Sequence, residues 1–186
     1  MGREAKLRRE QMKSRILAEI GEWTRPGTRG EAELAGEISQ LPTAMAKRES
    51  ASRLRWAWMK HGECHTNCRS YEENDPSKKF KSIAGWWKQP HGIYTFHSVI
   101  TNGEHFVCIT PGPGPDEMVF EFSPDPEVER ITKDDKYGTF QRRGVPVPKF
   151  VRSDPERTTR AAHLIMQRLE AGMDPIKAAE INLAEV

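Results

Sequence analysis

The chain has 186 residues, of which 36% are hydrophobic and 30% are charged, and its formal net charge at pH 7 is +2. This length suffices for a domain with its own core, while no apolar run approaches the length of a spanning helix, and the basic start lacks a secretory apolar segment. Three cysteines are too few for a disulfide framework, so we expect free thiols or ligands in a cytoplasmic protein.

The first third of the sequence has the periodicity of helices. Apolar residues recur at three- and four-residue steps between Arg3 and Trp23, which predicts an amphipathic helix. A second helix is predicted from Glu31 to Leu41, before a proline, and a third from Thr43 to Lys60, before a glycine. We therefore predict a helical N-terminal region over residues 1–61.

The sequence after Pro76 changes to β-branched and aromatic residues. Strands are predicted at Phe80 to Lys88, Gly92 to Ile100, Glu104 to Thr110, Glu117 to Ser123 and, in an otherwise loop-rich stretch, Gly138 to Gln141. The second and third of these strands flank Asn102-Gly103, the strongest hairpin signal in the chain. The expected fold class is α+β, with its core over residues 62–150. This core has an antiparallel sheet from Phe80 to about Phe122 and a cysteine-bearing helix packed on it, and helices from both termini flank it.

The C-terminal segment, residues 151–186, has two helix starts. Asp154-Pro155 and Asp174-Pro175 each place an N-cap aspartate before a proline at the first helical position. A helix-turn-helix for DNA is one interpretation, but Asp174, Glu180 and Glu185 would face phosphates poorly. We therefore predict a packing hairpin.

The hairpin at Asn102-Gly103 predicts which side chains share a face. With a two-residue turn, Thr101 pairs with Glu104 and His97 pairs with Cys108. Because side chains alternate along a strand, one face carries Thr95, His97, Val99, Phe106, Cys108 and Thr110, and the opposite face is mostly apolar core. Polar groups on a buried face need a partner or a function.

A second group of chemical side chains lies in the stretch GECHTNC. Gly62 permits a break, so Cys64 is expected in the first turn of a helix that continues to about Glu73. Unsatisfied amides and the helix dipole at that end stabilise a thiolate, which predicts a nucleophilic Cys64. Asn67 and Cys68 follow on the same side of the helix.

These three stretches, GECHTNC, AGWWKQPHGIYTFHSVI and NGEHFVCITP, resemble the papain-like cysteine enzyme superfamily in its compact bacterial and phage forms, such as transglutaminase-like and NlpC-type domains. The resemblance implies an antiparallel sheet with the cysteine at a helix start and no cofactor. It implies Cys64 as nucleophile, His97 as base, Thr110 as the residue orienting the imidazole, and Asn67 and Trp86 as substrate contacts. The implied activity is cysteine-dependent hydrolysis or transfer at an amide of a protein or peptide, as in an amidase, deamidase or peptidase.

Two alternatives stay open at this point. Thr110 stands where these families more often carry aspartate, which favours a non-catalytic binding or inhibitor protein on the same fold. A small structural-zinc protein would use Cys64, Cys68, His97 and Cys108, with His61 or His65 replacing some of them.

The tryptophans offer a further interpretation, a stacking platform for nucleic acid or sugar. Trp56, Trp58, Trp86 and Trp87 show no regular interleaving with basic residues, and aromatic residues on helices and strands are usually core. We therefore expect a core position for these rings, and neither nucleic acid nor a membrane as a partner.

Overall fold

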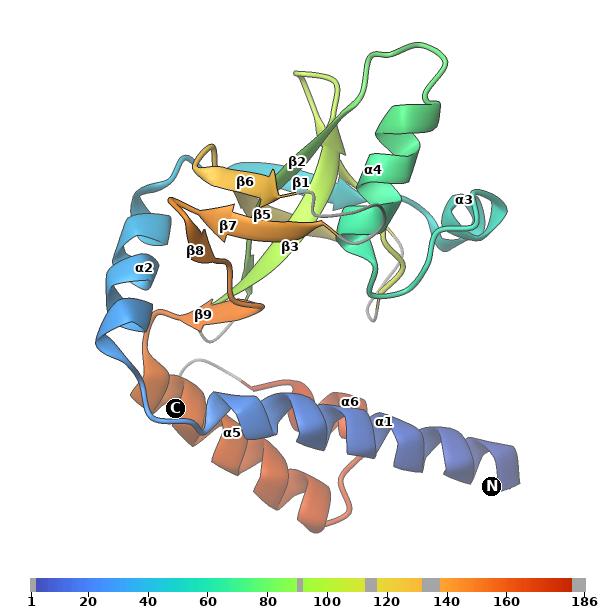
Figure 1. Cartoon of the computed structure of the whole chain (residues 1–186). Coiled ribbons are helices and arrows are strands. Elements are labelled where there is room, and N and C mark those ends of the chain that lie inside the picture. The colour runs from blue at the N-terminus through green and yellow to red at the C-terminus, as the bar shows by residue number, and fades with distance from the viewer. Residues whose placement is uncertain (1–2, 90–91, 113–116, 132–137, 182–186) are drawn as a thin grey trace. The chain divides into compact units, whose positions relative to one another are not determined.

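The computed structural model describes residues 3–89, 92–112, 117–131 and 138–181 (Figure 1). The chain divides into two units, which are described separately. The helical unit comprises residues 1–33, 90–93 and 152–186, and the barrel unit comprises residues 34–89 and 94–151. The three consecutive regions expected from the sequence thus regroup, because both chain ends belong to the same unit.

Three helices make up most of the helical unit. They are α1 (Arg3–Trp23), α5 (Pro155–Glu170) and α6 (Pro175–Ala179), and each is in contact with the other two. The side chains of Asp154 and Asp174 accept hydrogen bonds from backbone amides of the first turns, as N-caps do. The predicted helices and the packing hairpin are confirmed, whereas Glu185 lies outside the described residues.

A buried arginine holds the start of α5 to the end of α1. The guanidinium of Arg152 lies 2.7 Å from the carboxylate of Glu31 and donates to the carbonyl oxygens of Trp23 and Arg25 at 2.6 and 2.7 Å. Although burial opposes it, the hydrogen bonds from Arg152 lower the pKa of Glu31. A buried charge is tolerated only when it is paired in this way.

Five strands of the barrel unit form a closed barrel. They are β1 (Ala44–Arg48), β2 (Lys81–Gln89), β3 (Ile93–Thr101), β4 (Phe106–Cys108) and β5 (Val119–Pro124). Their order is β2-β5-β1-β4-β3, and β2 also pairs with β3, which closes the barrel. The α+β class is confirmed, but the simple antiparallel sheet is wrong, because β1 inserts between β5 and β4 and runs parallel to β4.

Strand β1 comes from a segment whose residues favour helix. Ala44–Arg48 alternates, with Ala46 and Arg48 buried and Met45 and Lys47 exposed, which is the period of a strand. The predicted helix from Thr43 to Lys60 is therefore wrong in its first part, and only α3 (Ala51–Trp56) remains helical. Pairing on both sides, with β4 and β5, overrides the local helix propensity.

The hairpin between β3 and β4 has a longer turn than predicted. Ile100 pairs with Val107 and Thr101 with Phe106, so the loop has four residues and the predicted two-residue turn is wrong. The Asn102 side chain explains the loop, because its carbonyl oxygen accepts the amides of Glu104 and His105. The register shifts by two residues, and a shift of two leaves the side chains of the paired strands on their predicted faces.

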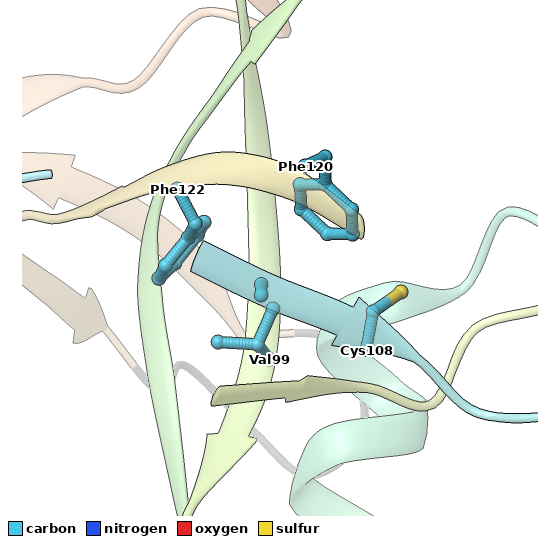
Figure 2. Packing of buried hydrophobic residues seen from close by; sticks show 5 residues of the cluster. Val99, Cys108, Phe120 and Phe122 are labelled. Carbon is cyan, nitrogen blue, oxygen red and sulfur yellow. The ribbon is translucent and has the colours of Figure 1, made fainter. Parts of the chain in front are cut away.

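The two predicted faces of the hairpin lie in two different cores. One face fills the barrel, where Val99 and Cys108 pack with Ala46, Phe120 and Phe122 (Figure 2). The opposite face carries Ile100 and Ile109, which pack with Leu54 of α3 and Cys68 of α4 (Cys64–Asn74). Helix α4 also lies against β2.

The remaining elements of the barrel unit cover Trp86. Helix α2 (Arg29–Gln40) begins in the helical unit, and its later residues Ala35 and Ile38 pack against Trp86. Strands β6 (Val128–Ile131), β7 (Thr139–Arg142) and β8 (Val145–Pro146) form a second, three-stranded sheet, and β9 (Phe150–Arg152) pairs beside β3. Only β7 of these strands is predicted from the sequence.

Two buried hydrogen bonds to Asp125 connect this second sheet to the barrel strands. The Asp125 carboxylate accepts from the indole nitrogen of Trp86 at 2.9 Å and from the Arg142 guanidinium at 2.8 Å. Arg142 also pairs with Glu37 and Glu127.

Over the described ranges, none of the helices has both the length and the apolar character needed to cross a lipid bilayer.

Candidate functional site

The start of helix α4 places Cys64 and Asn67 against the barrel. Gly62 has a φ of +75°, which glycine adopts without strain, and α4 begins two residues later. The Asn67 side-chain amide makes two hydrogen bonds to the loop that precedes α4. It donates to the backbone carbonyl oxygen of Lys60 at 2.8 Å and accepts a hydrogen bond from the backbone amide of the same residue at 3.0 Å. The helix start predicted at Cys64 is therefore confirmed, and Asn67 fixes it in place.

The Cys64 thiol is buried between α4 and β3. Burial raises its pKa, while hydrogen bonds from the backbone amides of Ser98 and His65 lower it by less. The burial of the thiol thus opposes the predicted thiolate in the unliganded chain, because loss of solvation outweighs the helix-end amides. Cys64 keeps 9% of its surface exposed, compared with 0% for Cys68 and 1% for Cys108, so it is the most accessible of the three thiols.

His97 points into the barrel, where its contacts are sulfur and aromatic rings. Its Nε2 lies 3.3 Å from the Cys108 sulfur, and its ring lies near those of Trp87 and Phe120. Burial lowers the pKa of His97 to about 3, with smaller contributions from the charges of His65 and Arg48. The imidazole is therefore neutral near pH 7.

Thr110 bonds to the helix and not to the histidine. Its hydroxyl accepts a hydrogen bond from the Asn67 amide at 3.3 Å, both side chains being buried. The group in contact with the His97 ring is the Cys108 thiol. Thr110 thus joins the end of β4 to α4, and its predicted role in orienting the imidazole has no contact to support it among the described residues.

Sequence reasoning missed Arg48, which reaches the same interior. Its guanidinium hydrogen-bonds to the Cys108 thiol and lowers that pKa, although burial of the thiol raises it by more. The guanidinium carbon also lies 5.7 Å from the centre of the Trp87 ring. The burial of Arg48 was missed because its segment was predicted to be helical. The alternation along Ala44–Arg48 is typical of a strand and could have indicated it.

A second polar contact that the sequence did not predict lies on the outer side of β3. The Nδ1 atom of His65 is 2.7 Å from the hydroxyl of Ser98, and the His65 ring packs against those of Phe96 and Phe140. Burial lowers the pKa of His65 to about 4. This pair fastens α4 to β3 directly beside Cys64.

Trp86 was expected to contact substrate, but it lies in the core. None of its side-chain surface is exposed, and its indole nitrogen is engaged by Asp125. It therefore offers no surface to a ligand.

The zinc alternative lacks the geometry it needs. Among residues 3–89, 92–112, 117–131 and 138–181, which include all three cysteines, no group of three or more His, Cys, Asp or Glu side chains could hold a metal ion. The three cysteines are free thiols. A structural zinc site requires four ligands around one point. The predicted ligands Cys64, Cys68, His97 and Cys108 do not meet this requirement.

The site that results has four parts: the first turn of α4, the middle of β3, the end of β4 and the end of β1. Its ionisable side chains are Cys64, His65, His97, Cys108 and Arg48. Burial keeps the thiols and imidazoles neutral near pH 7, and Arg48 is charged. No protein-family model, no curated protein and no solved structure matches the chain.

Proposed function

We propose that the barrel unit carries out cysteine-dependent acyl transfer or hydrolysis at an amide, with Cys64 as the nucleophile and His97 as the base. The observation that carries the proposal is the position of the Cys64 thiol at the start of a helix, within hydrogen-bonding distance of backbone amides. Cys64 begins α4, and the amides that hydrogen-bond to its sulfur include that of Ser98, the neighbour of His97 on β3. Amides directed at a cysteine sulfur are suited to stabilising negative charge there.

The reaction has a defined proton balance. The Cys64 sulfur forms a bond to the amide carbonyl carbon, and its proton passes to His97. Because Cys64 lies on the α4 side of β3 and His97 on its barrel side, this transfer requires a movement of the two side chains when substrate binds. The C–N bond then breaks as His97 returns the proton to the leaving amine. Water, or another acyl acceptor, attacks the resulting thioester and regenerates the thiol. Since the thiol pKa is raised and the imidazole pKa is lowered in the free chain, substrate binding must supply the change in environment that drives the first transfer.

The test uses p-nitrophenyl acetate, an activated acyl donor, on the whole chain. We expect acetylation at Cys64, located by mass spectrometry, and its loss in Cys64→Ser but not in the matched variant Cys68→Ser. His97→Gln is expected to slow acetylation by about a hundredfold or more, the typical contribution of general base catalysis. Acetylation elsewhere, or an unchanged rate in Cys64→Ser, contradicts the proposal.

A second candidate is a non-catalytic binding protein on the same fold. It is favoured by the neutrality of the thiols and imidazoles of the site and by the His97 ring, whose described polar contact is with Cys108. Under this alternative Cys64→Ser and His97→Gln change no reaction rate, and only the stability of the barrel unit responds to them.

A further inference from the structure

The turn that ends helix α3 breaks a strong local preference. After the C-cap Ala57, the amide of Trp58 bonds to the carbonyl of Arg55 and the amide of Met59 to that of Leu54, the pattern of a Schellman motif. The residue following the C-cap in this motif is left-handed and is usually glycine. Here it is Trp58, with a φ of +56°.

The same turn exposes two tryptophans. Trp56 is 84% exposed and Trp58 is 90% exposed, so the expectation that both lie in the core is wrong. The aliphatic residues around them, Leu54 and Met59, pack in the core beneath α4. The turn is therefore anchored from below, and burial within the chain does not compensate for the left-handed conformation of a bulky residue at position 58.

The charge of this segment is strongly positive. From Lys47 to Lys60 the sequence has five basic residues and one acidic residue. Arg53 is exposed and pairs at 3.1 Å with that acidic residue, Glu49, a surface ion pair that an external anion can replace at little cost. Arg55 is exposed and makes no ion pair with any residue in the described part of the chain.

We propose that the tryptophan turn, defined as Arg53 to Trp58, binds single-stranded nucleic acid. Bases stack on exposed indole rings irrespective of sequence, while arginines beside the rings bind phosphates. Charge complementarity favours a polyanion over a neutral peptide. A lipid surface is disfavoured because α3 has six residues and turns its aliphatic side into the core, which leaves only two rings for insertion.

This inference is independent of the proposed acyl transfer. The tryptophan turn belongs to α3 and the residues after it, whereas Cys64 and His97 belong to α4 and β3. Cys64→Ser is therefore expected to leave nucleic-acid binding unchanged, so that either proposal can fail alone.

The experiment measures anisotropy of fluorescein-labelled oligothymidylate and oligouridylate, with a duplex of the same length as competitor. We expect both single strands to bind and to quench tryptophan fluorescence, with the duplex competing weakly. Trp56→Ala and Trp58→Gly should each weaken binding about tenfold, as expected for one lost stacking contact. Arg55→Gln should reduce the slope of log affinity against log salt by about 0.7, the value for one phosphate on a single strand.

Trp58→Gly is the decisive variant, because glycine is the residue that the turn prefers and the fold should therefore be retained. Its thermal midpoint should equal or exceed that of the parent chain, which separates lost binding from lost folding. Val145→Ala, which trims another exposed apolar side chain, is the matched control and should bind as the parent does.

Three results overturn the proposal: no binding to either oligonucleotide at low salt, binding unaffected by Trp58→Gly, or equal binding of duplex and single strand. Preferential binding to phosphatidylserine vesicles, abolished by the same tryptophan variants, would also overturn it and assign the turn to a membrane surface.

Discussion

The barrel unit contains two buried polar regions that deal with burial in opposite ways. Around Asp125, the charges persist, because Arg142 is paired with a carboxylate whose side chain is 0% exposed. Around His97 and Cys108, the titratable groups lose their charge, and the pKa of the imidazole falls to about 3 while those of the thiols rise. Burial penalises any ion, so only a group with an opposite charge close by remains ionised.

The difference assigns different uses to the two regions. A paired, hydrogen-bonded ion cluster contributes specificity and stability but no reactive group, because every member is already engaged. A neutral cluster of sulfur and imidazole retains groups that can still exchange a proton when a ligand changes their surroundings. This is the physical reason for locating the proposed chemistry beside β3 and not beside Asp125.

The largest effect is expected from breaking the ion cluster. Asp125→Ala leaves the buried guanidinium of Arg142 without its fully buried partner and the indole nitrogen of Trp86 without an acceptor. We expect a loss of about 3–5 kcal/mol in the free energy of unfolding, measured with urea. Asp125→Asn, which keeps an acceptor, should lose less, and a loss below about 1 kcal/mol in the alanine variant would contradict the assigned role.

A smaller effect is expected from acidification of the neutral cluster. The folded-state pKa of His97 is depressed to about 3 and that of His65 to about 4, below the ordinary value of 6.5. Stability is therefore fully present above about pH 6.5 and declines as the pH falls toward these values, because the unfolded chain takes up protons that the folded chain excludes. Each histidine contributes a slope of at most about 1.4 kcal/mol per pH unit.

Urea titrations between about pH 7 and pH 5 measure this slope, in a range above the ordinary pKa of carboxylates. His97→Gln should flatten the dependence, with His65→Gln as the parallel variant on the outer face. An unchanged slope in both variants would show that these histidines are protonated in the folded chain.

The sequence predicted the helices and the faces of the hairpin more reliably than the closure of the sheet. Proline and aspartate set the starts of α5 and α6 locally, so the pattern sufficed. The faces around His97 were correct although the turn was two residues too short, because a shift of two preserves the alternation.

The barrel could not be read from local patterns because it depends on β1. Ala44–Arg48 consists of helix-forming residues, and its strand conformation arises from pairing with β4 and β5, which are distant in sequence. Tertiary packing also determines the ionisation of Cys64 in the site. The amides at the start of α4 were predicted, but the burial that outweighs them at Cys64 follows from the packing of α4 on the sheet.

A moderate effect is expected on the reactivity of Cys64. Because burial raises its pKa, its reaction with iodoacetamide at about pH 8 should be slower than that of free cysteine, and its rate should continue to rise at pH values where that of free cysteine has levelled off. The partial exposure of Cys64 should nevertheless make it the first thiol labelled, ahead of Cys68 and Cys108. Mass spectrometry after timed quenching locates the label, and fast labelling at about pH 6 would show a thiolate and reverse the assignment of this region as neutral.

The smallest effect is expected at the exposed edge of the ion cluster. Glu37 pairs with Arg142 and Arg143, and hydrogen bonding from Arg142 lowers its pKa, but 41% of its side chain is exposed. Solvent screens such a pair, so Glu37→Gln should lose less than about 1 kcal/mol in the free energy of unfolding, and the loss should shrink further as salt is added. Because Asp125 and Glu37 bond to the same guanidinium, the matched variants Asp125→Asn and Glu37→Gln differ chiefly in burial of the carboxylate. Equal losses at both positions would show that pairing with Arg142, and not burial, determines the stability of the cluster.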